Sequence, residues 1–264
     1  MPENDAADTR LLVASLRKAG AIARHFYGGT YKSWHKSPGN PVTEADIEID
    51  TFLKKTLLAA RPDYGWLSEE TADDPIRLTR ERVFVVDPID GTYGFLKHRP
   101  HFTIVGTVVE KGRPVSGAIY NPITEEMFEA TKSQGARKNA EPIHVSAQTG
   151  FDGMRLLAEK KILDPGHWTV PWPLSIHGET RASAAYRLAL VAAGEFDAMV
   201  ALSRKSDWDV AAGDLIVHEA GGLVTTREGE TLTYNREKTE HKSIICAGPT
   251  LHSRLLARMQ ELHE

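Results

Sequence analysis

The chain has 264 residues, of which 41% are hydrophobic, so it is long enough to bury a sizeable core in one large domain or two tightly joined halves. Its 32 basic and 36 acidic residues are interspersed and leave a net charge of -4, which excludes nucleic acid or an anionic membrane as a partner held by overall charge. The single cysteine, Cys246, excludes an internal disulfide and any zinc site built from several cysteines, and it fits a reducing cytoplasm.

The N-terminal segment, residues 1–9, is polar and acidic, and it lacks the basic-then-apolar pattern of a secretory signal. No apolar run approaches the roughly 20 residues that span a bilayer. We therefore expect a cytoplasmic protein without a membrane partner.

Two amphipathic helices are predicted at the start of the chain. Apolar residues recur at helical spacing from Leu11, and the first helix is expected to end near Gly28. The second helix is expected to follow Thr43 and to end just before Pro62. Its first turn is acidic and contains Asp46.

The centre of the chain has the pattern of a β-meander. Residues 83–86 are all apolar, which indicates a short interior strand, and this strand is expected to end in a turn over residues 87–92. Two β-rich runs, 103–110 and 114–120, are separated by a Lys-Gly-Arg sequence that is typical of a hairpin. Residues 127–131 predict a further strand.

The second half of the chain is predicted to alternate helices and strands. A loop-rich stretch with several prolines comes first. The predicted segments are a helix over 183–193 that stops at Gly194, a strand over 197–202, a helix over 209–220, short strands over 223–225 and 244–247, and a C-terminal helix from about Leu251. Cys246 lies in the last of these strands and is expected to be a buried, inert thiol.

Acidic residues gather at the boundaries of the predicted elements. Asp87 and Asp90 flank a proline directly after a buried strand, so the two acids are held close together where the backbone has little freedom. Their mutual repulsion requires a cation or a proton. A hard divalent ion such as magnesium prefers carboxylate and carbonyl oxygens, and the Ile89 carbonyl is also available in this turn. Glu69 is a candidate for a third acid and Asp209 for a fourth.

Each of these acids also has a structural explanation. The sequence Asp-Pro-x-Asp-Gly is a good turn by itself, and Glu69 with Glu70 would usually be a solvated surface pair. Asp209 is most simply an N-cap, and Asp46 would form a capping arrangement with Thr43. Their joint occurrence at element boundaries favours a metal site.

Gly91 and Thr92 add a candidate site for an anion. A glycine followed by a hydroxyl residue at a helix start offers free backbone N–H groups, and phosphate binds well to such groups. If the fold brings Thr92 and Asp46 together, the Thr92 hydroxyl is also suited to relay a proton from an attacking water. Thr92 as a simple N-cap is the structural alternative, and the two roles are compatible.

Four short blocks of sequence carry a resemblance to a known family. They are Val-Thr-Glu-Ala-Asp at 42–46, Leu-Ser-Glu-Glu at 67–70, Asp-Pro-Ile-Asp-Gly-Thr at 87–92, and Ser-Asp-Trp-Asp-Val-Ala-Ala-Gly at 206–213 with Glu-Ala-Gly-Gly at 219–222. In this order they resemble the inositol monophosphatase superfamily of lithium-sensitive, magnesium-dependent phosphatases. The resemblance spans about residue 11 to the C-terminus and implies an α/β (α+β) layered sandwich with alternating helix and sheet layers. We expect an N-terminal half over 1–135 and a C-terminal half over 136–264 that completes the site, within one compact unit.

The resemblance also implies a role for each acid. Glu69, Asp87 and the Ile89 carbonyl would hold one magnesium ion, and Asp87, Asp90 and Asp209 a second, with two or three ions in all. Glu69 and Thr92 would position the attacking water, and Asp46 would accept hydrogen-bonding or proton load from Thr92. The implied phosphate and substrate contacts are Asp90, Gly91, Thr92, Lys205, Ser206 and Asp209.

The implied substrate is a small phosphorylated metabolite, and two departures from the family pattern bear on which one. Inositol-specific members carry a glutamate seven residues before Asp209 and often a histidine three before it, where this chain has Leu202 and Ser206. An apolar side chain cannot hydrogen-bond a polyol, so inositol monophosphate is a weaker candidate. Arg204 and Lys205 beside that position would suit the second phosphate of 3′-phosphoadenosine 5′-phosphate, unless they are solvated loop residues.

Other implications of the resemblance stay open at this point. Histidinol phosphate is a third substrate used in the superfamily. Lys36 lies where the family often keeps a lysine near the metal site, and a homodimer is suggested. Some bacterial relatives act on the transcription machinery, so the alternative function is that of a mainly regulatory binding protein.

Overall fold

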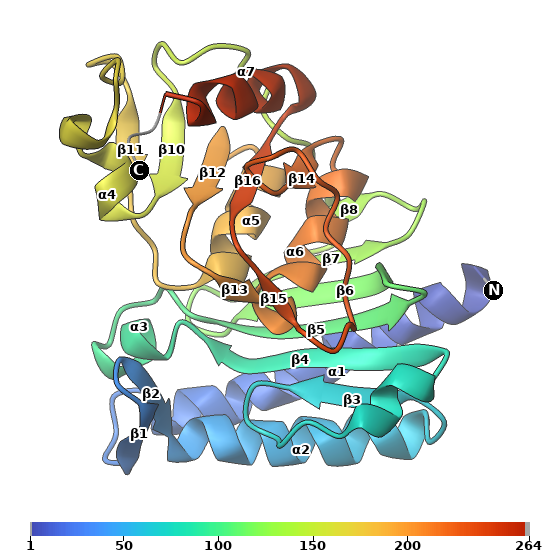
Figure 1. The fold of residues 1–264 in the computed structure, drawn as a ribbon. Helices are drawn as coiled ribbons and strands as arrows, with labels where there is room; N and C mark the ends of the chain where they lie inside the picture. Colours follow the sequence, from blue (N-terminus) through green and yellow to red (C-terminus); the bar gives the residue numbers. More distant parts are fainter. Residues whose placement is uncertain (1, 262–264) are drawn as a thin grey trace.

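Two helices from the start of the chain cover one face of a large β-sheet. The structure, a computed structural model, describes residues 2–261. Helix α1 spans Pro2–Phe26, which is earlier than the predicted start at Leu11, and α2 spans Glu44–Ala60 with Thr43 as its N-cap. Figure 1 shows both helices lying side by side below the sheet. The polar first turns of α1 gave no apolar periodicity, which is why the sequence pattern missed them.

The large sheet has seven strands in the order β3-β4-β5-β6-β7-β8-β9. Only β3 and β4 pair in parallel, and each later strand pairs antiparallel with the one before it, so the predicted meander is confirmed. The strands are β3 (Gly65–Ser68), β4 (Arg82–Asp90), β5 (Thr103–Glu110), β6 (Arg113–Asn121), β7 (Glu126–Thr131), β8 (Ala136–Lys138) and β9 (Glu141–Pro142).

Strand β4 is buried on both faces, as its continuous apolar run indicates. Phe84 and Val86 pack in one core with α1 and α2, whereas Val83 and Val85 pack in a second core on the opposite face. This alternation follows from the two-residue period of a strand. The predicted end of the strand before Asp87 was wrong, because pairing with β5 continues to Asp90 across an irregularity that accommodates the proline.

The second core lies between the large sheet and a smaller one. Helices α5 (Ala184–Ala192) and α6 (Asp207–Glu219) fill this middle layer. The smaller sheet has the order β11-β10-β12-β16-β14, with β10 (Arg155–Ala158), β11 (His177–Glu179), β12 (Ala198–Ala201), β14 (Leu223–Thr225) and β16 (Ile244–Ala247). Cys246 is fully buried in β16, as predicted, and burial raises the pKa of its thiol well above the ordinary value.

A third core covers the outer face of the smaller sheet. Leu251 and Leu255 of α7 (Pro249–Met259) pack there with Trp168 and with residues of β10. Helix and sheet layers therefore alternate through the molecule, and the predicted layered sandwich is confirmed (Figure 1). The remaining elements are β1 (Ser33–Ser37), β2 (Asn40–Thr43), η1 (Pro75–Thr79), α3 (Thr92–Leu96), α4 (Lys160–Leu163), η2 (Pro165–His167), β13 (Lys205–Ser206) and β15 (Glu240–His241). The division of the chain near residue 135 stays a prediction.

The loop-rich stretch before α5 shows where the sequence pattern was silent. Strands β10 and β11 and helix α4 lie within 151–179, a stretch predicted only as loop. Each is four residues long or shorter, too short for a period to emerge. Within residues 2–261, no helix has the combination of length and apolar content that crossing a bilayer demands.

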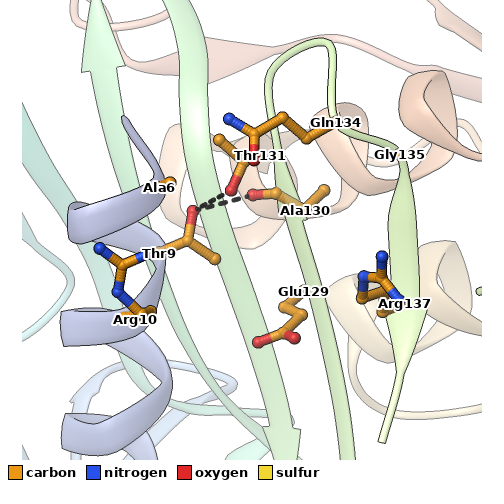
Figure 2. A pocket seen from close by; sticks show the side chains of 9 residues that line it. All are labelled: Ala6, Thr9, Arg10, Glu129, Ala130, Thr131, Gln134, Gly135 and Arg137. Atoms are coloured by element: carbon orange, nitrogen blue, oxygen red, sulfur yellow. Dashed lines mark hydrogen bonds between the residues drawn. The ribbon is translucent and has the colours of Figure 1, made fainter. Parts of the chain in front are cut away.

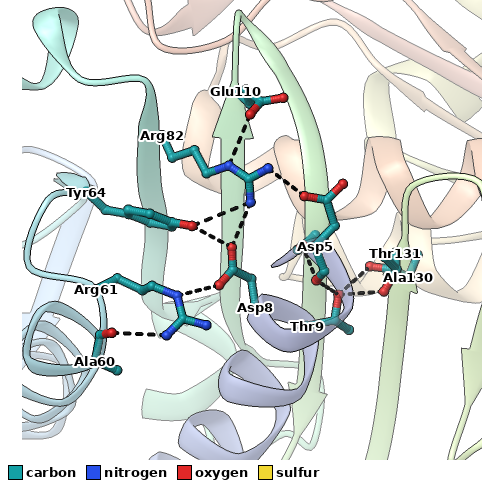
Figure 3. Close-up of polar contacts among 11 residues, drawn as sticks. Asp5, Asp8, Thr9, Ala60, Arg61, Tyr64, Arg82, Glu110, Ala130 and Thr131 are labelled. Carbon is teal, nitrogen blue, oxygen red and sulfur yellow. Dashed lines mark hydrogen bonds and ion pairs between the residues drawn. The ribbon is translucent and has the colours of Figure 1, made fainter. Parts of the chain in front are cut away.

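A buried ion network joins α1 to the large sheet (Figure 3). Arg82 of β4 donates from Nη2 to Asp5 at 2.6 Å, from Nη1 to Asp8 at 3.0 Å and from Nε to Glu110 at 3.1 Å. Asp8 is fully buried and also accepts from Arg61 Nε at 2.8 Å. Each charge in the network therefore has an opposite charge beside it, which offsets the cost of burial.

Replacement of Arg82 tests this network. Arg82→Met leaves two acids of α1 without their main cation, so we expect the free energy of unfolding to fall by about 3 kcal/mol. The exposed pair of Arg227 with Glu228 is the control. Arg227→Met should change the free energy of unfolding by less than about 0.5 kcal/mol. Urea denaturation of both variants measures the difference. Equal effects would show that the Arg82 network contributes nothing beyond a surface pair.

Candidate functional site

Three carboxylates from the two halves of the chain meet in the interior. Asp87 and Asp90 stand at the end of β4, and Asp209 stands in the first turn of α6. One oxygen of each lies within 4.8 Å of the others. Asp209 is more than one hundred residues after Asp90 in the sequence, and the two lie close together because α6 packs directly on β4 and β5.

Asp87 lacks a partner for half of its carboxylate. Its side chain is 1% exposed, and Oδ1 accepts a hydrogen bond from the Ile89 amide at 3.0 Å. Oδ2 is fully enclosed and has no hydrogen-bond donor among residues 2–261. Burial raises the pKa of Asp87 well above its ordinary value, and the negative charges of Glu69, Asp90 and Asp209 raise it further. An unpaired buried oxygen among like charges fits a hard cation.

Asp90 is held by the N-terminus of α5. Oδ2 accepts from Ser183 Oγ and from the Ala185 amide, each at 2.6 Å, and Oδ1 accepts from the Ala184 amide at 3.2 Å. Burial raises the pKa of Asp90, and these donors offset part of the rise. The carboxylate therefore fastens the end of β4 to the start of α5, a contact that the sequence pattern did not predict.

Asp209 is the third residue of α6 and not its N-cap. The helix starts at Asp207 with Ser206 as N-cap, and the Ser206 amide donates to Asp209 Oδ2 at 2.7 Å. The predicted helix start was two residues late, because an acid at the third position satisfies the cap as well as an N-cap residue does. Burial and then the charge of Asp90 raise the pKa of Asp209 to about 7.

Glu69 and Glu70 share a lysine beside this cluster. Lys36 Nζ donates to Glu69 Oε1 and to Glu70 Oε1, both at 2.8 Å. The Glu70 side chain is only 3% exposed, so the structural alternative of a solvated surface pair is wrong for Glu70. Burial raises the pKa of Glu70 to about 7 although Lys36 lowers it. Glu69 is outside the group of three carboxylates, yet its charge raises the pKa of both Asp87 and Asp209.

Thr92 and Asp46 are in contact. Thr92 Oγ1 lies 3.3 Å from Asp46 Oδ1 and 3.1 Å from the Ile89 carbonyl, and it has one proton to donate. Asp46 Oδ2 accepts from the amide of Thr43 at 2.8 Å and from its hydroxyl at 2.5 Å. The capping arrangement and the contact with Thr92 therefore coexist, one on each oxygen. Burial raises the pKa of Asp46 to about 6, although the bonds from Thr43 lower it.

Gly91 is the N-cap of α3, and Thr92 is the first helical residue rather than the N-cap. The φ angle of Gly91 is 93°, which only glycine adopts readily. A Cβ atom there would lie 2.9 Å from the Ser183 amide nitrogen and 3.0 Å from the His101 carbonyl oxygen. The N–H groups at this helix start have no carbonyl one turn back, so they are available to an anion.

The two cations expected to act together, Arg204 and Lys205, point to different neighbours. The Arg204 side chain is 67% exposed and pairs with Glu240 at 2.8 Å, so for this residue the solvated reading holds. Lys205 is mostly buried and donates to Ser203 Oγ at 2.6 Å. Leu202 packs against the outer core, so it offers the site no polar group.

A surface groove at the opposite end of the large sheet is separate from these acids. It has a volume of about 170 Å³ and lies between α1, β7 and β8 (Figure 2). Thr9 Oγ1 bonds Thr131 Oγ1 at 2.7 Å at its edge, and Arg10, Glu129 and Arg137 line it. None of the predicted site residues lines this groove.

Comparisons with known proteins agree along almost the whole chain. A model described as the inositol monophosphatase family matches residues 6–264. The inositol-1-monophosphatase of Caulobacter vibrioides is 34% identical over 261 residues, which is 95% of this chain and 99% of that protein. The Nus factor SuhB of Escherichia coli K12 is 30% identical over 263 residues, 95% of each chain. The native crystal structure of the extragenic suppressor protein suhB from Bartonella henselae has a TM-score of 0.85 at 30% identity, over 97% of this chain and 99% of that one.

Replacement of Asp87 should change the stability of the protein in opposite directions without and with Mg²⁺, relative to the wild type. In chelator, Asp87→Asn removes a buried charge from a repelling cluster, so the free energy of unfolding should rise by about 2 kcal/mol. In millimolar Mg²⁺ the wild type should gain thermal stability and the variant should not. Thermal and urea unfolding with and without Mg²⁺ measure both effects.

Asp50→Asn is the matched control for this prediction. Asp50 is also a buried acid, but it accepts from Ser68 at 2.5 Å and from Thr71 at 2.6 Å. Its replacement should lower stability by about 1 kcal/mol in chelator and leave the Mg²⁺ effect intact. A stabilising effect of Mg²⁺ that survives Asp87→Asn would contradict the metal site.

Proposed function

Because the chain belongs to the inositol monophosphatase family, we propose that it is a metal-dependent phosphomonoesterase that hydrolyses a small phosphorylated metabolite. The observation that carries the proposal is the cluster of Asp87, Asp90 and Asp209, with an enclosed, unpaired oxygen on Asp87. The candidate anion site at Gly91 and Thr92 follows directly after two of these acids in the chain. A site that holds cations beside free N–H groups is suited to a phosphate ester.

Magnesium is the proposed metal, with two or three ions at the site. All the candidate ligands are oxygens, and hard divalent cations prefer such ligands. Glu69, Asp87 and the Ile89 carbonyl would hold one ion, and Asp87, Asp90 and Asp209 a second. When bound, the ions supply water activation and neutralise charge on the phosphate and the leaving oxygen.

The remaining residues position the reactants. Thr92 Oγ1, once it donates its proton to Asp46 Oδ1, has lone pairs free to accept a hydrogen bond from the attacking water. Glu69 would help to position the same water, and Asp46 would take up the proton load of Thr92. The amides of Gly91 and Thr92 would hold the phosphate oxygens, and Lys205 and Ser206 would contact the rest of the substrate.

The substrate proposed first is 3′-phosphoadenosine 5′-phosphate or inositol monophosphate, and histidinol phosphate is the alternative. Leu202 and the mostly buried Lys205 favour a substrate with a second charge over a neutral polyol, because Lys205 attracts an anion and Leu202 cannot bond a hydroxyl. A homodimer and a cytoplasmic location stay predictions.

Phosphate release from a panel of substrates tests the proposed activity. We expect turnover of at least one of inositol monophosphate, 3′-phosphoadenosine 5′-phosphate, histidinol phosphate and fructose 1,6-bisphosphate in millimolar Mg²⁺. Chelator should abolish it, because the acids alone repel the phosphate. Turnover of none of them, by a protein that is folded and stabilised by Mg²⁺, would overturn the proposal.

Thr92 tests the positioning of the water. Thr92→Val keeps the shape of the side chain and removes the hydroxyl, so kcat should fall by about 100-fold with KM nearly unchanged. Thr92→Ser should restore most of the activity. Thr51→Val, on the exposed face of α2, is the control and should leave kcat unchanged. A comparable loss in Thr92→Ser would point to packing rather than to the hydroxyl.

A second candidate function comes from the relatives named Nus factor SuhB, 29–30% identical to this chain. In this alternative the protein acts mainly as a regulatory binding partner and the catalytic residues are dispensable. A strain that tolerates Asp87→Asn but not loss of the protein would favour this alternative over the enzyme.

A further inference from the structure

Arg77 is a buried arginine that none of the roles above uses. It belongs to the short helix η1 and is 1% exposed. Its Nε and Nη2 donate to the two oxygens of Asp73 at 2.6 and 2.9 Å. Its Nη1 donates to Asn235 Oδ1 at 2.7 Å, and Nη2 also donates to the Arg236 carbonyl at 3.1 Å. Arg77 therefore joins its own segment to one that lies 158 residues further along the chain.

The segment that contains Arg77 also carries Glu69, a candidate metal ligand. Asp73, the ion-pair partner of the arginine, comes four residues after Glu69 in the chain. The stretch between them is also held from α2, where Asp50 accepts from Ser68 at 2.5 Å and from Thr71 at 2.6 Å. The backbone on both sides of Glu69 is therefore tied to buried partners.

The second segment contacts the start of α6. The Asn235 amide donates to Asp207 Oδ2 at 2.7 Å, and His241 Nε2 lies 2.9 Å from Asp207 Oδ1. The Asp207 amide donates in turn to the Thr239 carbonyl at 2.8 Å. Asp207 is fully buried and is the first residue of α6, two residues before Asp209. Both of its carboxylate oxygens are therefore bonded to this segment.

Asn235 connects Arg77 to Asp207. Its φ angle is 54°, in the left-handed region, which asparagine tolerates better than most residues. In this conformation its side-chain oxygen accepts from Arg77 while its backbone amide donates to Asp207. These three residues, which we call the Arg77 network, form a continuous series of hydrogen bonds from the Glu69 segment to the first turn of α6.

The candidate metal ligands stand on three separate elements. Asp87 and Asp90 end β4, and Glu69 follows β3, which pairs directly with β4. Asp209 stands on α6, which packs on the large sheet through apolar side chains. Hydrophobic packing is non-directional, so it brings α6 to the sheet without the accuracy that a metal site needs. Hydrogen bonds have preferred lengths and angles, and the Arg77 network supplies them at the start of α6.

We propose that Arg77 and Asn235 are positioning residues of the candidate metal site. Through Asp207 they set the separation between Glu69 and Asp209, and this separation sets the affinity of the site for its cations. The inference rests on the proposed function and adds to it two residues that act through other side chains, without contact with an ion or a substrate. Groups that orient metal ligands typically contribute about 10- to 100-fold to metal affinity.

Stabilisation of the fold alone is the main competing explanation. Arg82 provides the matched control, because it is also a buried arginine that joins distant segments, but it lies at the opposite end of β4 from Asp90. Arg77→Met and Arg82→Met each remove one positive charge. Loss of a positive charge by itself would tighten the binding of a cation. Weaker binding in Arg77→Met therefore cannot come from the lost charge.

Calorimetry of Mg²⁺ binding to the whole chain, without substrate, tests the proposal. Arg77→Met should raise the Kd for Mg²⁺ by about tenfold or more relative to the wild type. Arg82→Met should leave the Kd within about twofold of the wild-type value, because the distant charge is screened. Arg77→Lys keeps the charge and part of the hydrogen bonding, so it should restore part of the affinity.

Asn235→Gly is a second variant that leaves the net charge unchanged. Glycine adopts a positive φ readily, so the replacement removes the acceptor for Arg77 and keeps the amide that bonds Asp207. The Kd for Mg²⁺ should again rise by about tenfold. Thermal unfolding in chelator shows whether each variant is folded. If Arg77→Met does not fold, Asn235→Gly provides the same comparison with the wild type.

Two outcomes would overturn the positioning role. One is an unchanged Kd in Asn235→Gly, and the other is an equal rise in Arg77→Met and Arg82→Met, which is the result of a purely structural role. Mg²⁺ binding needs no turnover, so failure of the proposed function is distinguishable. If the variants bind Mg²⁺ more weakly but the wild type hydrolyses no ester, only the enzymatic proposal fails. If the wild type hydrolyses an ester and the variants bind Mg²⁺ as tightly as it does, only the positioning role fails.

Discussion

The structure depends on gathering carboxylates in a place where water cannot solvate them. Asp87 and Asp90 are buried and Asp209 is half-buried. Burial raises the pKa of each, and the charge of Asp90 raises the pKa of Asp87 and of Asp209 further. The fold supplies N–H donors to each of them, but it leaves one oxygen of Asp87 with none. A cluster that is stable only with added positive charge is a poor structural element and a good cation site. Proteins retain such unfavourable arrangements where function requires them.

The Arg82 network shows what a structural solution to buried charge looks like in the same molecule. There, Arg82 bonds both Asp5 and Asp8, and Arg61 supplies Asp8 with a second cation. The two clusters lie at opposite ends of strand β4, which begins at Arg82 and ends at Asp90. Both contain buried acids, but only the Arg82 network pairs each acid with a cation. The difference between them lies in the hydrogen bonds that are left unmade rather than in the number of charges, and it supports the proposal that the Asp87 cluster is the functional one.

The layered architecture explains how the site is assembled. Strand β4 carries two acids at its C-terminal end. The middle helix layer brings the N-termini of α5 and α6 to the same place. Helix N-termini favour negative charge, so the same packing that buries the core also tolerates the acids.

The features that can be read from the amino-acid sequence alone are the local ones. The strand over 83–86, the hairpin over 103–120 and the acids at element boundaries were all visible, because hydrophobic period and turn chemistry act over a few residues. The bond from Ser183 to Asp90 and the sharing of Lys36 by Glu69 and Glu70 were not. These contacts join segments tens of residues apart, or depend on what covers a side chain. Only the packing of helices on sheets decides them, because burial and pairing are properties of the assembled layers and not of any one segment.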